Sequence, residues 1–232
     1  MRVALFCHSL LSDYAHGSAH FLRGIVTELI ARRHDVRVLE PRSAWSVESL
    51  VKEHGPDAIH LASKAYPRLR SRRYELATLD LDEVLESVDL AIVHAWNDPE
   101  LIRRIAERRL RPGARCKALL YDTHRRSITT EAASAPDLSG YDGVLAAGAA
   151  AVEEHVKREF GRHQVWVWRE AADPRVFFPR PAPDAGKRGD VVWIGNWKDE
   201  QRWKSSTSGS SRRSTGSHLP RRCTECDIRK RR

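Results

Sequence analysis

Two histidines are the residues of this sequence best suited to acid–base chemistry. His94 closes the apolar run Asp89–His94, and His124 follows the run Cys116–Tyr121 within the segment Asp122-Thr123-His124. An imidazole at the end of a strand can serve as a general base or as a metal ligand. The spacing matches no recognised zinc pattern, so we expect no metal. Structural hydrogen bonding is the alternative to an acid–base role for both residues.

Further polar side chains follow the same apolar runs. In parallel α/β sheets, ligands bind beyond the carboxyl ends of the strands. One such loop on its own is usually a solvated turn, but four loops at one edge predict a cleft. Its expected wall consists of Gly17, His16, Trp96, Asp98, Asp122 and Glu170.

The elements that must position these residues follow from hydrophobic patterning. Apolar residues recur at helical spacing between Phe21 and Ile30, and again after Asp98-Pro99, a typical helix start. A third helix is expected over Ala149–Phe160. Short apolar runs between the helices predict strands, namely Val3–Cys7, Val36–Leu39, Asp89–His94, Cys116–Tyr121, Val144–Ala147 and Val165–Trp168.

Strands that alternate with helices favour an α/β fold, with a Rossmann-like parallel sheet flanked by helices on both faces. The order of elements between Ser43 and Leu81 does not follow from the pattern. The Pro-rich stretch after Trp168 predicts an extended connector.

Several nucleotide-binding and catalytic motifs are missing. The dinucleotide fingerprint G-x-G-x-x-G is absent, since the first loop offers only Gly17 and then Gly24. Glu40 ends the second predicted strand where a ribose-binding acid would lie, but without the glycines this signal is weak. A nicotinamide oxidoreductase is therefore a lesser alternative. The phosphate loop and the nucleophile elbow are also missing.

The last 32 residues differ in composition from the rest. Residues 201–232 contain 10 Lys and Arg against 2 Asp and Glu, so they supply eight of the nine net positive charges. Such a segment has too little apolar surface to fold alone, and we expect it to be disordered. A binding module that meets nucleic acid or an acidic surface through this tail is the alternative function, although we do not expect sequence-specific nucleic-acid binding. The lone pair Cys223 and Cys226 lacks the four ligands of a structural zinc site.

The remaining bulk features fit a cytoplasmic protein. Cys7 and Cys116 lie within apolar runs and are expected to be buried thiols. No signal peptide or stretch of about 20 apolar residues is visible.

Several motifs in order resemble bacterial GT-B glycosyltransferases, and the closest type is the family 1 / CgeB-like spore-protein group. The likeness covers about residues 1–202. The segments that carry it are His8–Leu10, Gly17–Gly24, His94–Pro99, Asp122–His124, Ser139–Leu145, Glu170–Asp173 and Asp190–Trp197.

This resemblance implies two Rossmann-like domains facing each other across a cleft. The expected parts are an acceptor-side domain over residues 1–170, a linker over 171–189, the first strand of an incomplete second domain over 190–202, and the tail over 203–232. Gly195 and Asn196 would lie on the donor side. The tail would be either a genuine extension or the product of a frameshift.

The implied reaction transfers a sugar from a nucleotide-sugar donor to a hydroxyl of a glycan or small-molecule acceptor, with no cofactor beyond the donor itself. His94 and His124 would activate the acceptor. Because most of the donor domain is not in the sequence, we expect negligible turnover.

Overall fold

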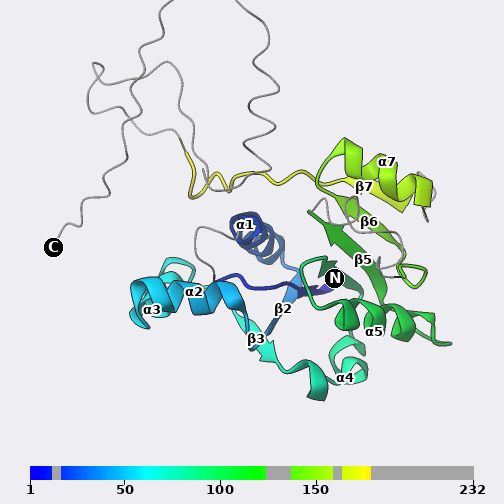
Figure 1. Ribbon diagram of the computed structural model, residues 1–232, viewed down its shortest axis with the longest axis horizontal. Helices are drawn as coiled ribbons and strands as arrows, with labels where there is room; N and C mark the ends of the chain where they lie inside the picture. The colour runs from blue at the N-terminus through cyan, green and yellow to red at the C-terminus, as the bar shows by residue number, and fades with distance from the viewer. Residues whose placement is uncertain (12–16, 124–136, 159–163, 179–232) are drawn as a thin grey trace, which may run out of the picture. The chain divides into compact units, whose positions relative to one another are not determined.

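The computed structural model describes residues 1–11, 17–123, 137–158 and 164–178 (Figure 1). The chain divides into two units, Met1–Pro179 and Arg180–Arg232, and every described residue belongs to the first. Within these described ranges, no helix is long and apolar enough to cross a membrane.

A seven-stranded sheet forms the centre of this unit, with the order β3-β2-β1-β4-β5-β6-β7. All six neighbouring pairs are parallel. The predicted α/β Rossmann-like class is therefore confirmed. The strands are β1 (Arg2–Phe6), β2 (Asp35–Pro41), β3 (Ser71–Tyr74), β4 (Leu90–His94), β5 (Lys117–Asp122), β6 (Gly143–Ala146) and β7 (Val165–Val167).

Helices connect the strands on both sides of the sheet (Figure 1). The strand order reverses between β1 and β4. The helices that connect strands on the β2 side of this point and those on the β4 side therefore cover opposite faces of the sheet. The helical elements are α1 (Ser18–Ala31), α2 (Trp45–His54), α3 (Asp57–Ala65), the 3-10 turn η1 (Leu76–Thr78), α4 (Leu81–Leu85), α5 (Pro99–Leu110) and α7 (Ala149–Arg158).

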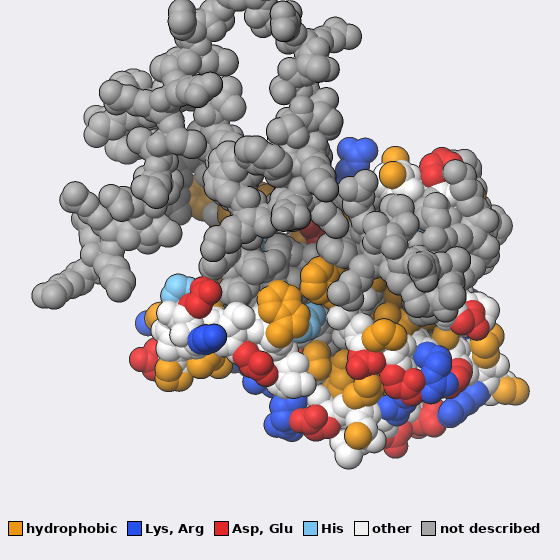
Figure 2. All heavy atoms as spheres, viewed as in Figure 1, with side chains coloured by type: hydrophobic (Ala, Val, Ile, Leu, Met, Phe, Trp, Pro, Cys, Tyr) orange, Lys and Arg blue, Asp and Glu red, His pale blue; other side chains and the backbone are white. Residues whose placement is uncertain are grey.

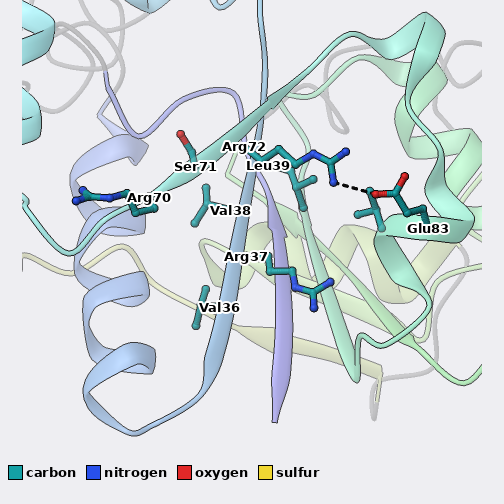
Figure 3. A pocket seen from close by; sticks show the side chains of 9 residues that line it. Val36, Arg37, Val38, Leu39, Arg70, Ser71, Arg72 and Glu83 are labelled. Atoms are coloured by element: carbon teal, nitrogen blue, oxygen red, sulfur yellow. Dashed lines mark hydrogen bonds and ion pairs between the residues drawn. The ribbon is translucent and has the colours of Figure 1, made fainter.

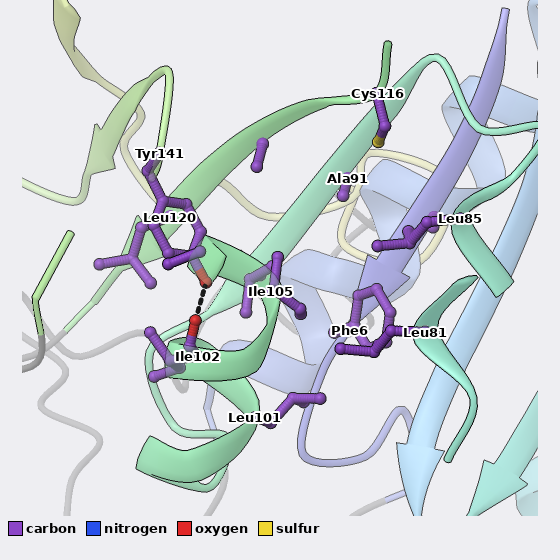
Figure 4. Close-up of a cluster of buried hydrophobic side chains, with 14 of the residues drawn as sticks. Phe6, Leu81, Leu85, Ala91, Leu101, Ile102, Ile105, Cys116, Leu120 and Tyr141 are labelled. Atoms are coloured by element: carbon purple, nitrogen blue, oxygen red, sulfur yellow. Dashed lines mark hydrogen bonds between the residues drawn. The ribbon is translucent and has the colours of Figure 1, made fainter. Parts of the chain in front are cut away.

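Alternation along β1 explains how both faces are buried. Val3 and Leu5 pack with α1 on one side, which we call the α1 face, in a cluster that includes Leu22. Phe6 and its neighbour Ala4 belong to the other cluster, on the α5 face, where α4 and α5 pack against the sheet. Figure 4 shows this second cluster, with Phe6 beside the leucines of α4 and α5.

The chain after β7 passes over α1 and so runs back toward the middle of the sheet (Figure 1). Asp173 packs against Gly24, where an added Cβ would lie 3.2 Å from the Asp173 Cβ. Arg175 donates to the Gly24 carbonyl at 3.2 Å and pairs with Glu28 at 3.3 Å. These contacts fix the segment that carries Glu170.

One strand was absent from the expected set. β3 has the sequence Ser-Arg-Arg-Tyr, and only Tyr74 is buried. It is an edge strand that pairs with β2 alone, so the apolar pattern of a buried strand is missing. The six predicted strands and the helix start at Asp98-Pro99 agree with the structure. The predicted end of the helix Ala149–Phe160 lies outside the described residues.

Candidate functional site

His94 lies at the carboxyl end of β4, fully buried, on the α1 face. Its Nε2 is 2.9 Å from the hydroxyl Oγ1 of Thr123, which follows β5. Its ring stacks on Tyr121, with centroids 5.1 Å apart. The register explains this neighbourhood, because His94 and Tyr121 are partners in the β4–β5 ladder.

Tyr121 connects His94 to the segment after β7. The Tyr121 hydroxyl donates to Glu170 Oε1 at 3.0 Å. Its ring also packs edge-on against Trp168 at 4.9 Å and lies 5.8 Å from Phe21. Burial raises the pKa of Tyr121 far above its usual value, and the Glu170 charge raises it further, so the phenol keeps its proton. The structure thus places Glu170 beside the tyrosine that supports His94.

Asp122 is separated from this group by the pleat of the strand. Its side chain points to the α5 face, as successive residues of β5 alternate, and Oδ2 lies 2.8 Å from Nε2 of the buried His155 on α7. The structure therefore brings Glu170 toward His94 through Tyr121 and directs Asp122 away from both.

A second aromatic group forms around Trp96. Its ring lies 6.3 Å from Trp45, which in turn lies 5.1 Å from His8. The Ser46 N–H donates to His8 Nε2 at 3.5 Å, and burial lowers the pKa of this imidazole, which favours the neutral ring. Figure 2 shows hydrophobic side chains and a histidine exposed together near the middle of this face, beside α2, while charges of both signs alternate over α4 and α5.

Asn97 and Asp98 have structural partners. The Asn97 amide donates to the carbonyls of Phe6 and His94, at 2.9 and 2.8 Å, and thus joins the ends of β1 and β4 where the strand order reverses. Asp98 caps α5 by accepting from the Glu100 N–H at 2.8 Å. Capping of α5 is a sufficient structural reason for the exposed Asp98 carboxylate, and no ligand is needed to explain its position.

Gly17 precedes α1 with a right-handed helical backbone, φ −54° and ψ −39°. An added Cβ would meet nothing within 4 Å among the described residues. The conformation therefore does not require glycine at this position. His16, His124, Gly195 and Asn196, which the sequence also proposed, lie outside the described residues, so their roles stay predictions.

Two hollows lie on the β2 side of the sheet. The larger hollow, about 350 Å³, lies beside the first residues of β2. These residues have no β3 partner, because the β2–β3 pairing starts only at Val38 and Ser71. Figure 3 shows Arg37 and Val36 pointing to opposite sides of β2, with the Arg72–Glu83 ion pair at the rim. The charged side chains that line this larger hollow are exposed. The smaller hollow, about 210 Å³, is lined by buried charges from α1 and β2.

Neither hollow presents a metal centre. Among the described residues, no three His, Cys, Asp or Glu side chains come together in a way that could hold an ion. Cys7 and Cys116 are buried free thiols, as expected, and burial raises the pKa of both.

Comparison with known proteins gives a distant structural similarity. No protein-family model matches the sequence, and no curated protein matches it. Among solved structures, the chain is similar to an alpha-glucosyltransferase in complex with UDP and a 13-mer DNA containing a central A:G mismatch, with 13% identity and a TM-score of 0.42. The match covers 72% of this chain and 40% of that one. A likeness of this size establishes neither the family nor the ligand of this chain.

Sequence patterning missed several residues that shape this edge of the sheet. Tyr121 was assigned only to a strand, although a period of two along β5 distinguishes it from Asp122. His155 lies three residues after Val152 on the buried side of α7, which is a detectable signal. Trp45 lies in the stretch whose elements the pattern left unordered.

Proposed function

We propose that residues 1–170 form the acceptor-side domain of a GT-B-type glycosyltransferase, which transfers a sugar from a nucleotide-sugar donor to an acceptor hydroxyl. The segments that resemble such enzymes, and a parallel sheet with polar side chains beyond its strand ends, support this proposal.

The contact between His94 and Thr123 carries the proposal. A general base must lie within about 3.2 Å of the proton that it removes. Nε2 of His94 already has a hydroxyl, that of Thr123, at 2.9 Å. Because His94 is fully buried and Thr123 only partly, we propose that an acceptor hydroxyl passes its proton to the imidazole through the threonine hydroxyl.

Trp96 and Glu170 would line the acceptor side. An indole offers an apolar surface to a sugar ring, and Trp96 is partly exposed beside Trp45. The Glu170 carboxylate is exposed next to Tyr121 and can accept from sugar hydroxyls. Catalysis by His94 and His124 and donor contacts from Gly195 and Asn196 belong to the same proposal.

A binding experiment tests the acceptor side without requiring turnover. The purified 232-residue chain is applied to an array of glycans and hydroxylated small molecules, and each hit is titrated by tryptophan fluorescence. We expect Trp96→Ala to weaken a hit about tenfold, on the order of 1.4 kcal/mol, while Trp166→Ala, an exposed tryptophan on β7, leaves it unchanged. Tight quenching by NADH with no hydroxylated hit would instead favour an oxidoreductase.

The proton path has its own variants. Thr123→Val keeps the shape of the side chain and removes its hydroxyl, whereas Thr123→Ser keeps the hydroxyl. The variants are compared when the chain is supplied with a donor domain that supports sugar transfer. The rate of transfer should then fall about 100-fold or more in the valine variant and much less in the serine variant. Equal rates for the two variants would remove Thr123 from the mechanism.

A further inference from the structure

Two buried charged side chains hold the backbone of Leu10 from opposite ends. The Leu10 N–H donates to Glu40 Oε1 at 2.6 Å, and its carbonyl accepts from an Arg23 terminal nitrogen at 2.7 Å. Glu40, at the end of β2, is 1% exposed, and Arg23, on α1, is 6% exposed. The loop after β1 is thus fixed between β2 and α1.

Each of these side chains keeps one polar atom without a partner. Within the described part of the chain, Glu40 Oε2 and Arg23 Nε are buried and make no hydrogen bond of normal geometry. The hydroxyls of Ser71 and Ser9 lie near enough to stabilise the Glu40 carboxylate without closing such a bond to Oε2. Burial raises the pKa of Glu40, and contacts such as the Leu10 N–H offset this only in part. Burial likewise lowers the pKa of Arg23. A buried polar group without a partner destabilises the fold, so a ligand that supplies both partners would recover that free energy.

Both residues line the smaller hollow, of about 210 Å³. Ser71 and Ser63 add hydroxyls to its wall, and Tyr66 adds an aromatic ring whose centroid lies 4.9 Å from the Arg23 guanidinium carbon. Since a water molecule occupies about 30 Å³ of liquid, this space admits a single small ring. It lies between α1, the segment after α3, and the start of β3.

The two buried atoms without a hydrogen-bond partner determine which ligand groups can bind. Glu40 Oε2 needs a donor and Arg23 Nε needs an acceptor. A phosphate would pair with Arg23 and with the exposed Arg70 at the rim, but it would be repelled by Glu40 and leave Glu40 Oε2 without a donor. An ammonium group would pair with Glu40 and be repelled by both arginines. Neighbouring hydroxyls on one ring supply a donor and an acceptor together without net charge.

We propose that the hollow formed by Glu40, Arg23 and Ser71 binds the vicinal diol of a sugar ring. The site is separate from the His94 group, because β1 lies between β2 and β4 and two strand spacings make about 10 Å. It does not depend on sugar transfer at His94. The diol has two possible sources, a free hexose and the ribose of a nucleoside.

Saturation-transfer NMR with the full chain tests the site. The probes are glucose, galactose and mannose for the hexose arm, and adenosine with 2′,3′-dideoxyadenosine for the nucleoside arm. We expect a hexose to bind, or adenosine to bind and the dideoxy compound to fail. Glu40→Gln should weaken binding about tenfold and Ser71→Ala about fivefold, while Glu86→Gln, an exposed glutamate after α4, should have no effect.

Ser71 is exposed at the start of β3, so its variant should fold even if Glu40→Gln does not. Three results would overturn the assignment. These are no binding of any probe, equal binding of adenosine and its dideoxy form, and unchanged binding in Ser71→Ala and in a folded Glu40→Gln.

Discussion

Asp122 Oδ2 lies 2.8 Å from His155 Nε2, and both side chains are almost completely buried between β5 and α7. This pair ties α7 to the sheet. His155→Ala removes one hydrogen-bond partner of the buried Asp122 carboxylate, and such a loss typically costs about 1–3 kcal/mol. We expect that loss in the free energy of urea unfolding, with roughly half of it restored in His155→Gln, whose amide can still donate. Equal stability of the alanine variant and the natural chain would contradict a structural role for the pair.

Among the polar residues near the point where the strand order reverses, between β1 and β4, Asn97 should be the one whose substitution costs most stability. Its amide donates to the carbonyls of Phe6 and His94, and its oxygen accepts from the Tyr74 hydroxyl at 3.3 Å. Asn97→Asp cannot donate and would place a charge against two carbonyl oxygens. We expect a loss of about 3 kcal/mol or more on thermal or urea unfolding. Asp98→Asn is the matched control, because asparagine caps helices as well as aspartate does, and its effect should be within about 0.5 kcal/mol.

The outcome at these residues shows what sequence patterning can and cannot resolve. Asp98-Pro99 carries a local helix-start signal, and the cap is present as expected. Asn97 has no local signal, since its partners Phe6 and Tyr74 are far away in the sequence. Asp122 was predicted at the correct strand end, but its side chain faces α7 and not His94. Alternation along β5 separates it from Tyr121, whereas the pairing that brings His94 beside Tyr121 depends on the register of β4 and β5.

Glu40 illustrates the same limit on the other side of the sheet. A charge at the end of an apolar strand is visible in the sequence, and it suggested a ribose contact. The bond to Leu10 and the hollow beside it depend on Arg23 and Ser71, which come from α1 and from the unexpected strand β3. An edge strand as polar as β3 lacks the hydrophobic pattern from which strands are predicted.

Two glycines should respond oppositely to the same substitution. At Gly140 an added Cβ would lie 2.3 Å from the Ala106 carbonyl oxygen, so α5 cannot pack there against a larger residue. Gly140→Ala should cost about 2–4 kcal/mol through displacement of α5. Gly17 has open space and a helical backbone, so Gly17→Ala should be neutral or slightly stabilising. Unfolding of both variants under the same conditions provides the comparison, and a large loss at Gly17 would mean that its glycine is required for another reason.

The end of α1 offers a stabilising change. Arg33 has φ +64° and donates to the Ile30 carbonyl, while His34 donates to the Leu29 carbonyl. This is the Schellman pattern, in which glycine is preferred at the left-handed position. Arg33→Gly should raise the free energy of unfolding by about 0.5–1 kcal/mol. Arg32→Gly, one residue earlier with φ −81°, should not stabilise, and a gain there equal to that at Arg33 would contradict the argument.

Asp142 should make stability depend on pH at the amino edge of the sheet. Burial raises its pKa, but Arg109, Lys117 and the Ala118 N–H more than offset this and hold the pKa at about 2. Because the folded pKa is lower than the unfolded value of 3.8, the contribution is complete above about pH 5 and is lost as the pH falls toward 2.

The shift from 3.8 to about 2 corresponds to about 2.4 kcal/mol, and solvent screening of this partly exposed carboxylate reduces the contribution to stability. Asp142→Asn should therefore be less stable than the natural chain by about 1–2 kcal/mol at pH 7, and the difference should vanish near pH 2. Urea unfolding across this range measures both curves, with the exposed Asp35→Asn as the control. A difference that stayed constant between pH 7 and pH 2 would mean that packing, and not the charge of Asp142, stabilises the contact between α5 and β5.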